Sequence, residues 1–129
     1  MNDGVQFGGV RALVVEDDPP NQIVASRLLA RIGCQVGVAH SGAEALRMMA
    51  EGTFDIVFMD IHMPQMDGYT ATAAIREREG GREEVKIVAM TADAMPGIRE
   101  KCFAAGMDDY ISKLIAVDSL LLVLRRWFS

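Results

Sequence analysis

The sequence has few of the residues that mark zinc-binding, disulfide-bonded or membrane-spanning proteins. Its two cysteines, Cys34 and Cys102, are far apart rather than in the short pairs that bind zinc, which fits ordinary thiols in a reducing compartment. No apolar stretch approaches the ~20 residues of a membrane helix, and residues 1–9 lack the basic and apolar parts of a signal peptide. We therefore expect a cytoplasmic protein without direct membrane contact, preceded by a flexible segment over residues 1–9.

Positive charge is also sparse. The chain carries 13 Lys and Arg against 18 Asp and Glu, a net charge of -5, and the basic residues are scattered. A nucleic-acid partner requires a basic patch or stripe, so we exclude one. With 50% hydrophobic residues and only four prolines, 129 residues are enough for one folded domain with its own core. Proteins and cations are the expected partners of such an acidic domain.

Short apolar runs alternate with longer helical patterns five times along the chain, which predicts repeated strand–helix units. The runs are apolar on both alternating faces, as expected of strands covered by helices on both sides. The predicted strands are residues 10–16, 34–39, 54–60, 85–91 and 109–113. The predicted helices are residues 20–32, the segment between 41 and 52, and residues 69–78, 95–105 and 117–128. In the first helix, the spacing predicts a buried stripe of Val24, Leu28 and Ile32.

Five such units restrict the fold. About 120 residues are too few for an eight-stranded barrel, and right-handed crossovers then leave a doubly wound sheet. We predict a flavodoxin-like α/β domain over residues 10–128, with a five-stranded parallel sheet of order 2-1-3-4-5 and five helices. In such folds, ligands bind beyond the carboxyl ends of the strands, where the strand order reverses.

Polar side chains follow the predicted strands at those ends. In chain order they are Glu16, Asp17, Asp18, Asp60, Thr91 and Lys113. If the first and third strands are neighbours, their carboxylates share one pocket, and carboxylates that close raise each other's pKa unless a cation neutralises them. Mg²⁺ suits such a site, because it binds one or two carboxylates, a carbonyl and several waters.

A pocket with carboxylates, a metal ion, a hydroxyl and one lysine suits phosphoryl transfer, which depends on positioning and charge neutralisation. Asp60 can act as the nucleophile and form an aspartyl phosphate. Lys113 would then supply a positive charge, and Thr91 a hydrogen bond to a phosphate oxygen. Asp17 and Asp18 have a plainer alternative as caps of the first helix, and Asp18 is the better candidate for that role.

Four separated motifs carry a family resemblance. EDD at 16–18, FMDIHMPQMDG around Asp60, AMTADAM around Thr91 and YISK ending at Lys113 resemble the receiver domains of two-component response regulators. The resemblance extends over about residues 10–128, and the motif sequences are most similar to those of receivers of hybrid sensor histidine kinases. A cytoplasmic part of a membrane-anchored hybrid kinase is therefore a further expectation for this chain.

The resemblance implies a phosphorelay function. Asp60 would accept a phosphoryl group from a histidine kinase or histidine phosphotransfer domain, as a signalling phosphoacceptor that catalyses its own phosphorylation and dephosphorylation rather than a conventional enzyme. The resemblance assigns Mg²⁺ to Glu16, Asp17, Asp60 and the main-chain carbonyl of His62.

The resemblance also implies a switch. Thr91 and Tyr110 would report phosphorylation to the face formed by the fourth helix, the fifth strand and the fifth helix. In addition, we expect the side chains of His62 and Asp93 to overhang the pocket and to tune how fast water removes the phosphate.

Two features depart from the family pattern or from a simple helix. The family usually has proline after the lysine, often through a cis bond, whereas here Leu114 follows Lys113. A non-proline cis bond costs about 2.5 to 4 kcal/mol, so we predict a trans bond. The five consecutive apolar residues 120–124, LLLVL, cover all sides of a helix, so they cannot all face the sheet. Either one leucine is simply exposed, or this face forms a homodimer or kinase-domain interface.

Three other functions remain as alternatives. A receiver-like domain could act as a phosphorylation-independent protein interaction module. A flavodoxin-like cofactor binder would need a glycine- and hydroxyl-rich loop after the first strand, where this chain has the acidic EDDPPN. A Mg²⁺-dependent phosphohydrolase would carry its aspartate nucleophile after the first strand and a cap over the substrate.

Overall fold

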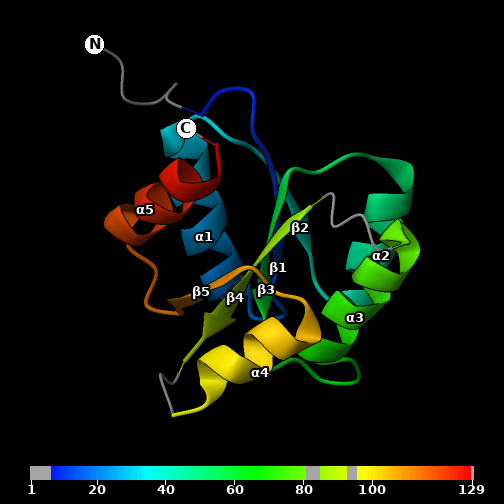
Figure 1. Ribbon diagram of the computed structural model, residues 1–129. Helices are drawn as coiled ribbons and strands as arrows, with labels where there is room; N and C mark the ends of the chain where they lie inside the picture. Colours follow the sequence, from blue (N-terminus) through cyan, green and yellow to red (C-terminus); the bar gives the residue numbers. More distant parts are fainter. Residues whose placement is uncertain (1–6, 81–84, 93–95, 129) are drawn as a thin grey trace.

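The computed structural model describes residues 7–80, 85–92 and 96–128, and it contains a five-stranded parallel sheet (Figure 1). The strand order is β2-β1-β3-β4-β5, as predicted. The elements are β1 (Arg11–Val15), α1 (Pro19–Ile32), β2 (Gln35–Ala39), α2 (Gly42–Glu51), β3 (Ile56–Asp60), α3 (Gly68–Glu79), β4 (Lys86–Thr91), α4 (Ile98–Ala105), β5 (Asp109–Ser112) and α5 (Val117–Phe128). The doubly wound α/β fold with five helices is therefore confirmed.

Helices cover both faces of the sheet (Figure 1). Alternate residues of each strand face opposite layers: in β3, Ile56 and Phe58 pack with α1 and α5, whereas Val57 and Met59 pack with α2, α3 and α4. All four side chains are fully buried. A strand buried on both faces requires a continuous apolar run, which explains the sequence of β3.

The buried face of α1 differs from the predicted stripe. Val24 is 46% exposed, and the stripe was wrong at this position, although Ile32 is buried as expected. The physical reason is that Gln22 takes an inward position, where its amide donates to the carbonyl of buried Glu16. The buried residues of α1 are Gln22, Ala25, Leu29 and Ile32.

Two helix starts show what sets the element boundaries. Asp18 caps α1, because its carboxylate accepts a hydrogen bond from Asn21 N at 3.2 Å, as predicted. Helix α4 begins only at Ile98, later than the predicted start near residue 95. Gly97 precedes it with a φ of 88°, a left-handed conformation that a right-handed helix cannot contain.

The chain packs into the core before residue 10. Phe7 is buried with α1 and α5, and its N–H donates to Ile32 O at 3.2 Å. The division between residues 1–9 and 10–128 stays a prediction, but Phe7 belongs to the folded core. Among the described residues, the helices do not combine the length and the hydropathy that crossing a membrane requires.

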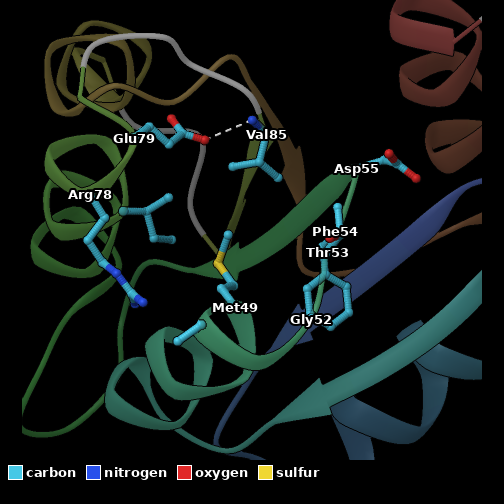
Figure 2. A pocket seen from close by; sticks show the side chains of 10 residues that line it. Met49, Gly52, Thr53, Phe54, Asp55, Arg78, Glu79 and Val85 are labelled. Atoms are coloured by element: carbon cyan, nitrogen blue, oxygen red, sulfur yellow. Dashed lines mark hydrogen bonds between the residues drawn. The ribbon is translucent and has the colours of Figure 1, made fainter.

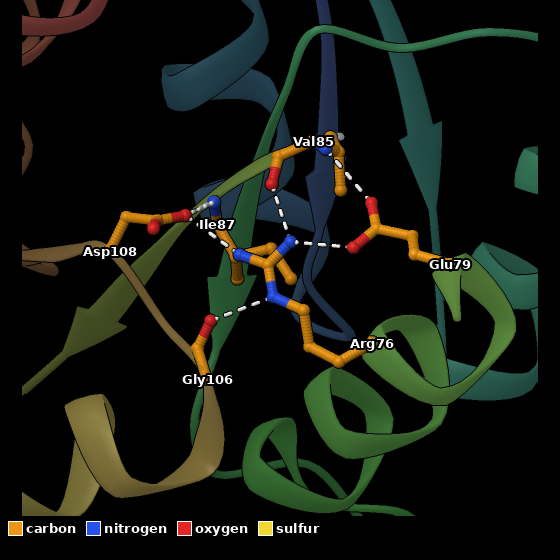
Figure 3. Close-up of polar contacts among 6 residues, drawn as sticks. All are labelled: Arg76, Glu79, Val85, Ile87, Gly106 and Asp108. Carbon is orange, nitrogen blue, oxygen red and sulfur yellow. Dashed lines mark hydrogen bonds and ion pairs between the residues drawn. The ribbon is translucent and has the colours of Figure 1, made fainter. Parts of the chain in front are cut away.

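A buried ionic cluster around Arg76 joins α3 to the segment before β5 (Figure 3). The guanidinium forms ion pairs with Glu79 at 2.9 Å and Asp108 at 2.7 Å, and these side chains are only 12 to 14% exposed. It also donates to the carbonyls of Gly106 and Val85. Because Arg satisfies planar acceptors in several directions at once, one side chain fixes three parts of the chain relative to each other.

We predict that Arg76→Ala lowers the free energy of unfolding by about 3 kcal/mol, because Glu79 and Asp108 lose their buried counterion. Urea denaturation measures the loss. Arg47→Ala is the matched control: its ion pair with Glu44 spans 3.8 Å and its side chain is 65% exposed, so the expected loss is below about 0.5 kcal/mol. Equal losses in the two variants would contradict a structural role for the Arg76 cluster.

Candidate functional site

Three carboxylates meet where β1 and β3 end. Glu16 and Asp17 follow β1, Asp60 is the last residue of β3, and one oxygen from each lies within 4.8 Å of the others. Glu16 and Asp60 are 1% and 0% exposed, whereas Asp17 is exposed. Because β1 and β3 are adjacent parallel strands, the predicted shared acidic pocket is present.

Lys113 supplies the positive charge of this site. Its Nζ lies 3.0 Å from Asp60 Oδ2 and 3.2 Å from Glu16 Oε1. The other carboxylate oxygens accept main-chain hydrogen bonds: Asp60 Oδ1 from His62 N at 3.0 Å, and Glu16 Oε2 from Asp18 N at 3.1 Å. The structure thus brings together four of the residues predicted from the sequence, counting Asp17.

The pKa values of Glu16 and Lys113 are both raised, but burial acts in opposite directions on the two groups. Burial raises the pKa of Glu16 from 4.5 to about 7, and the nearby Asp60 adds to the rise although Lys113 opposes it. Burial lowers the pKa of Lys113, but the hydrogen bond and charge of Asp60, together with Glu16, outweigh burial and raise it. Lys113 is therefore held in its charged form, while Glu16 takes up a proton easily.

A glycine allows α3 to begin against the backbone of Asp60. A Cβ at Gly68 would lie 2.4 Å from Asp60 O, and Gly68 N donates to Ile61 O at 2.9 Å. The connecting loop also holds Gln65 at a φ of 70°, a conformation uncommon for residues other than glycine. The MPQMDG segment thus turns tightly because α3 packs directly on the main chain of Asp60.

The remaining predicted site residues fall into three groups. Thr91 is buried at the end of β4, and its carbonyl accepts from Lys113 N at 2.8 Å. Tyr110 is half-buried in β5, and with Thr91 it lines a hollow of about 580 Å³ between α4 and α5. His62 is exposed, and the roles of its carbonyl and ring stay predictions. Asp93 lies outside the described residues.

The bond between Lys113 and Leu114 is trans, as predicted, because the described residues contain no cis peptide bond. Leu114 N donates to Ser112 Oγ at 3.1 Å, and the leucine side chain is 90% exposed. Ile23 and Val24 of α1 are also exposed, at 47% and 46%. Apolar side chains therefore stand on the helix that follows Asp17 and directly beside Lys113.

A second hollow lies away from this chemistry, at the amino end of the sheet (Figure 2). It measures about 490 Å³ and is lined by the ends of α2 and α3, with Met49, Phe54 and Arg78 among its residues. None of the predicted site residues lines it.

The donor set at the acidic site fits a hard cation. Its side-chain donors are the carboxylate oxygens of Glu16, Asp17 and Asp60, and Lys113 is the one cation that pairs with Glu16 and Asp60 among the described ion pairs. Mg²⁺ prefers oxygen ligands of this kind. Sequence reasoning missed one neighbour of the site, Gln22, because an amide in an amphipathic helix gives no pattern that distinguishes an inward from an outward position.

Comparisons with known proteins agree with the motifs. A family model for the response regulator receiver domain matches residues 12–125. Over 120 residues, or 92% of its length, the chain is 39% identical to hybrid signal transduction histidine kinase G of Dictyostelium discoideum. The chain spans only 4% of that kinase's length.

Two solved structures are similar over most of the chain. The receiver domain of sensor histidine kinase PA1611 from Pseudomonas aeruginosa, with a magnesium ion in its active site cleft, is 41% identical with a TM-score of 0.82, covering 92% of this chain and 96% of that one. The receiver domain of Saccharomyces cerevisiae Ssk1, in complex with the histidine phosphotransfer protein Ypd1, is 28% identical with a TM-score of 0.84, covering 92% and 88%.

We predict that the metal-free protein loses stability as pH rises from about 4.5 to about 7. In this interval the folded protein keeps a proton on Glu16 that the unfolded chain has released. The free energy of unfolding therefore falls by up to about 3 kcal/mol. Urea denaturation in a chelator, at about pH 5 and about pH 8, measures the change. Glu16→Gln is the control and is expected to remove this part of the slope; an unchanged slope would contradict the prediction.

Proposed function

The chain belongs to the response regulator receiver domain family, and we propose that it accepts a phosphoryl group on Asp60 from a phosphohistidine. The observation that carries the proposal is the position of the Asp60 carboxylate, fully buried at the end of β3 with Lys113 Nζ at 3.0 Å. Glu16 and Asp17 stand beside it. This arrangement favours a phosphoacceptor over the phosphorylation-independent module, because a pure interaction domain has no use for a buried carboxylate paired with lysine.

The chemistry follows from the groups that contact Asp60. A carboxylate oxygen of Asp60 attacks phosphorus, the bond from phosphorus to the donor imidazole breaks, and the electron pair stays on the imidazole nitrogen, which takes up a proton. Lys113 balances negative charge on the transferring group. The His62 N–H holds Asp60 Oδ1 and so orients the carboxylate.

Glu16, Asp17 and Asp60 are the side chains that would hold Mg²⁺, with the His62 carbonyl as the predicted fourth protein ligand. When bound, Mg²⁺ supplies neutralisation of charge on the acids and on the phosphoryl oxygens. The magnesium site named for the PA1611 receiver supports this assignment.

We also propose that Thr91 and Tyr110 report phosphorylation to the face formed by α4, β5 and α5. In support, the Thr91 carbonyl is bonded to Lys113 N, and Tyr110 lies on the adjacent strand. Phe103 and Leu122, 42% and 61% exposed, make the same face suited to a second copy of the chain. Light scattering before and after phosphorylation tests dimer formation there.

We predict that incubation with Mg²⁺ and acetyl phosphate adds one phosphate to the parent protein, measured as intact mass. Asp60→Asn is the matched control and is expected to gain none, because it keeps the shape of the side chain without its nucleophilic oxygen. A parent that binds Mg²⁺ but gains no phosphate would favour the phosphorylation-independent interaction module.

For the partner, we propose that a histidine kinase or histidine phosphotransfer domain docks on the exposed apolar side chains Ile23, Val24 and Leu114. The complex of Ypd1 with the Ssk1 receiver supports this class of partner. Ile23 and Val24 stand on α1, which follows Asp17, and Leu114 directly follows Lys113, so a donor that binds these side chains can present its phosphohistidine to the pocket.

We predict that Leu114→Ala slows transfer from a phosphorylated histidine phosphotransfer domain about tenfold, as expected for one buried contact of about 1.4 kcal/mol. Labelling by acetyl phosphate is expected to stay unchanged, because that donor needs no docking surface. Leu122→Ala, an exposed leucine of α5, is the control and is expected to leave both rates unchanged. Equal slowing with both donors would show that Leu114 acts on Lys113 instead.

A further inference from the structure

The first turns of α1 contact Glu16 at both its side chain and its main chain. Asp18 N donates to the Glu16 carboxylate, and the Gln22 amide nitrogen lies 2.5 Å from the Glu16 carbonyl oxygen. Gln22 is 9% exposed and is the one polar residue among the buried residues of α1. A buried amide is retained at such a position when it satisfies buried polar groups.

The same amide nitrogen also reaches the loop after β2. Gln22 Nε2 lies 2.7 Å from His40 Nδ1, and the His40 main-chain N–H donates to the Glu44 carboxylate. Glu16 N in turn donates to Ala39 O at 3.0 Å. The ends of β1 and β2 are therefore joined twice, once through the main chain and once through Gln22.

The tautomer of the His40 ring follows from the hydrogen bonds of Gln22. A carbonyl oxygen can only accept, so one N–H of the amide is donated to Glu16 O. The second N–H of the amide points to His40, and Nδ1 must accept it. This contact assigns the imidazole the tautomer whose Nδ1 accepts and whose proton is on Nε2.

We propose that Gln22 is a positioning residue for the divalent cation site, and that Nδ1 of His40 is the acceptor that holds Gln22 in place. By donating to the Glu16 carbonyl, the Gln22 amide fixes the main chain of Glu16, whose carboxylate would bind the cation. Partners that hydrogen-bond to metal-ligating groups contribute about tenfold or more to metal affinity, and we expect an effect of similar size from Gln22. The inference rests on the proposed Mg²⁺ site and adds residues from α1 and from the loop after β2 to it.

The test measures Mg²⁺ binding by calorimetry, with no phosphodonor present. In Gln22→Leu, which fills the same space without donors, the Mg²⁺ dissociation constant is expected to rise about tenfold. In His40→Ala, which removes the acceptor, it is expected to rise about threefold or more, whereas His40→Asn offers an amide oxygen near the position of Nδ1 and is expected to stay within about twofold of the parent.

Two further readouts separate positioning from stability. Urea denaturation of the metal-free variants shows how much of each effect is structural, and the nitrogen chemical shifts of the His40 ring are expected to report the Nε2–H tautomer in the parent. Because His40 is exposed, its two variants keep the test informative even if Gln22→Leu does not fold.

The outcomes distinguish the inference from its premise. A parent that binds no Mg²⁺ would overturn the metal site itself. A parent that binds Mg²⁺, with Gln22→Leu less stable but of unchanged affinity, would overturn only the positioning role. Equal affinities of His40→Ala and His40→Asn would overturn the role of His40 as acceptor.

Discussion

The site depends on one lysine placed between two buried carboxylates. Asp60 and Glu16 are almost completely removed from solvent, and each would be costly to keep ionised alone. Lys113 contacts both. One positive charge cannot neutralise two buried carboxylates and the adjacent Asp17, so a negative excess remains. Burial raises the pKa of Glu16, and the charge of Asp60 adds to the rise. The negative excess makes the site suitable for a divalent cation.

The distance between Lys113 and Asp60 is set by elements that are fixed far from the site. Asp60 lies against the start of α3, where Gly68 permits close packing, and Lys113 follows β5. Arg76, near the other end of α3, bonds to Gly106 and Asp108 just before β5 begins. The Arg76 cluster therefore joins the helix that packs on Asp60 to the segment that precedes the strand leading to Lys113.

The sheet and the acidic site could be predicted from the sequence because their signals are local. Parallel strands buried on both faces give continuous apolar runs, and a polar residue that ends such a run marks the binding edge, as Asp60 does. The bonds of Gln22 and Arg76 could not be predicted. Arg76 and Asp108 are 32 positions apart, and nothing near either residue indicates the other.

Errors in the helices have the same origin. The apolar spacing in α1 favoured a face containing Val24, but a hydrogen bond from Gln22 to a strand end selected another face. The start of α4 was placed too early because the left-handed conformation of Gly97 is a property of the folded backbone. Periodicity predicts that a helix exists, whereas polar contacts with the sheet decide which side faces inward.

Leu114 shows how a departure from the family pattern can leave the site intact. The family usually has proline here, yet Lys113 still reaches both carboxylates across a trans bond. The main chain around Lys113 is held by two hydrogen bonds, from Lys113 N to Thr91 O and from Leu114 N to Ser112 Oγ. Proline has no N–H and could not make the second bond. The Leu114 N–H thus adds a main-chain contact next to Lys113 that proline would lack, while the leucine side chain is exposed to solvent.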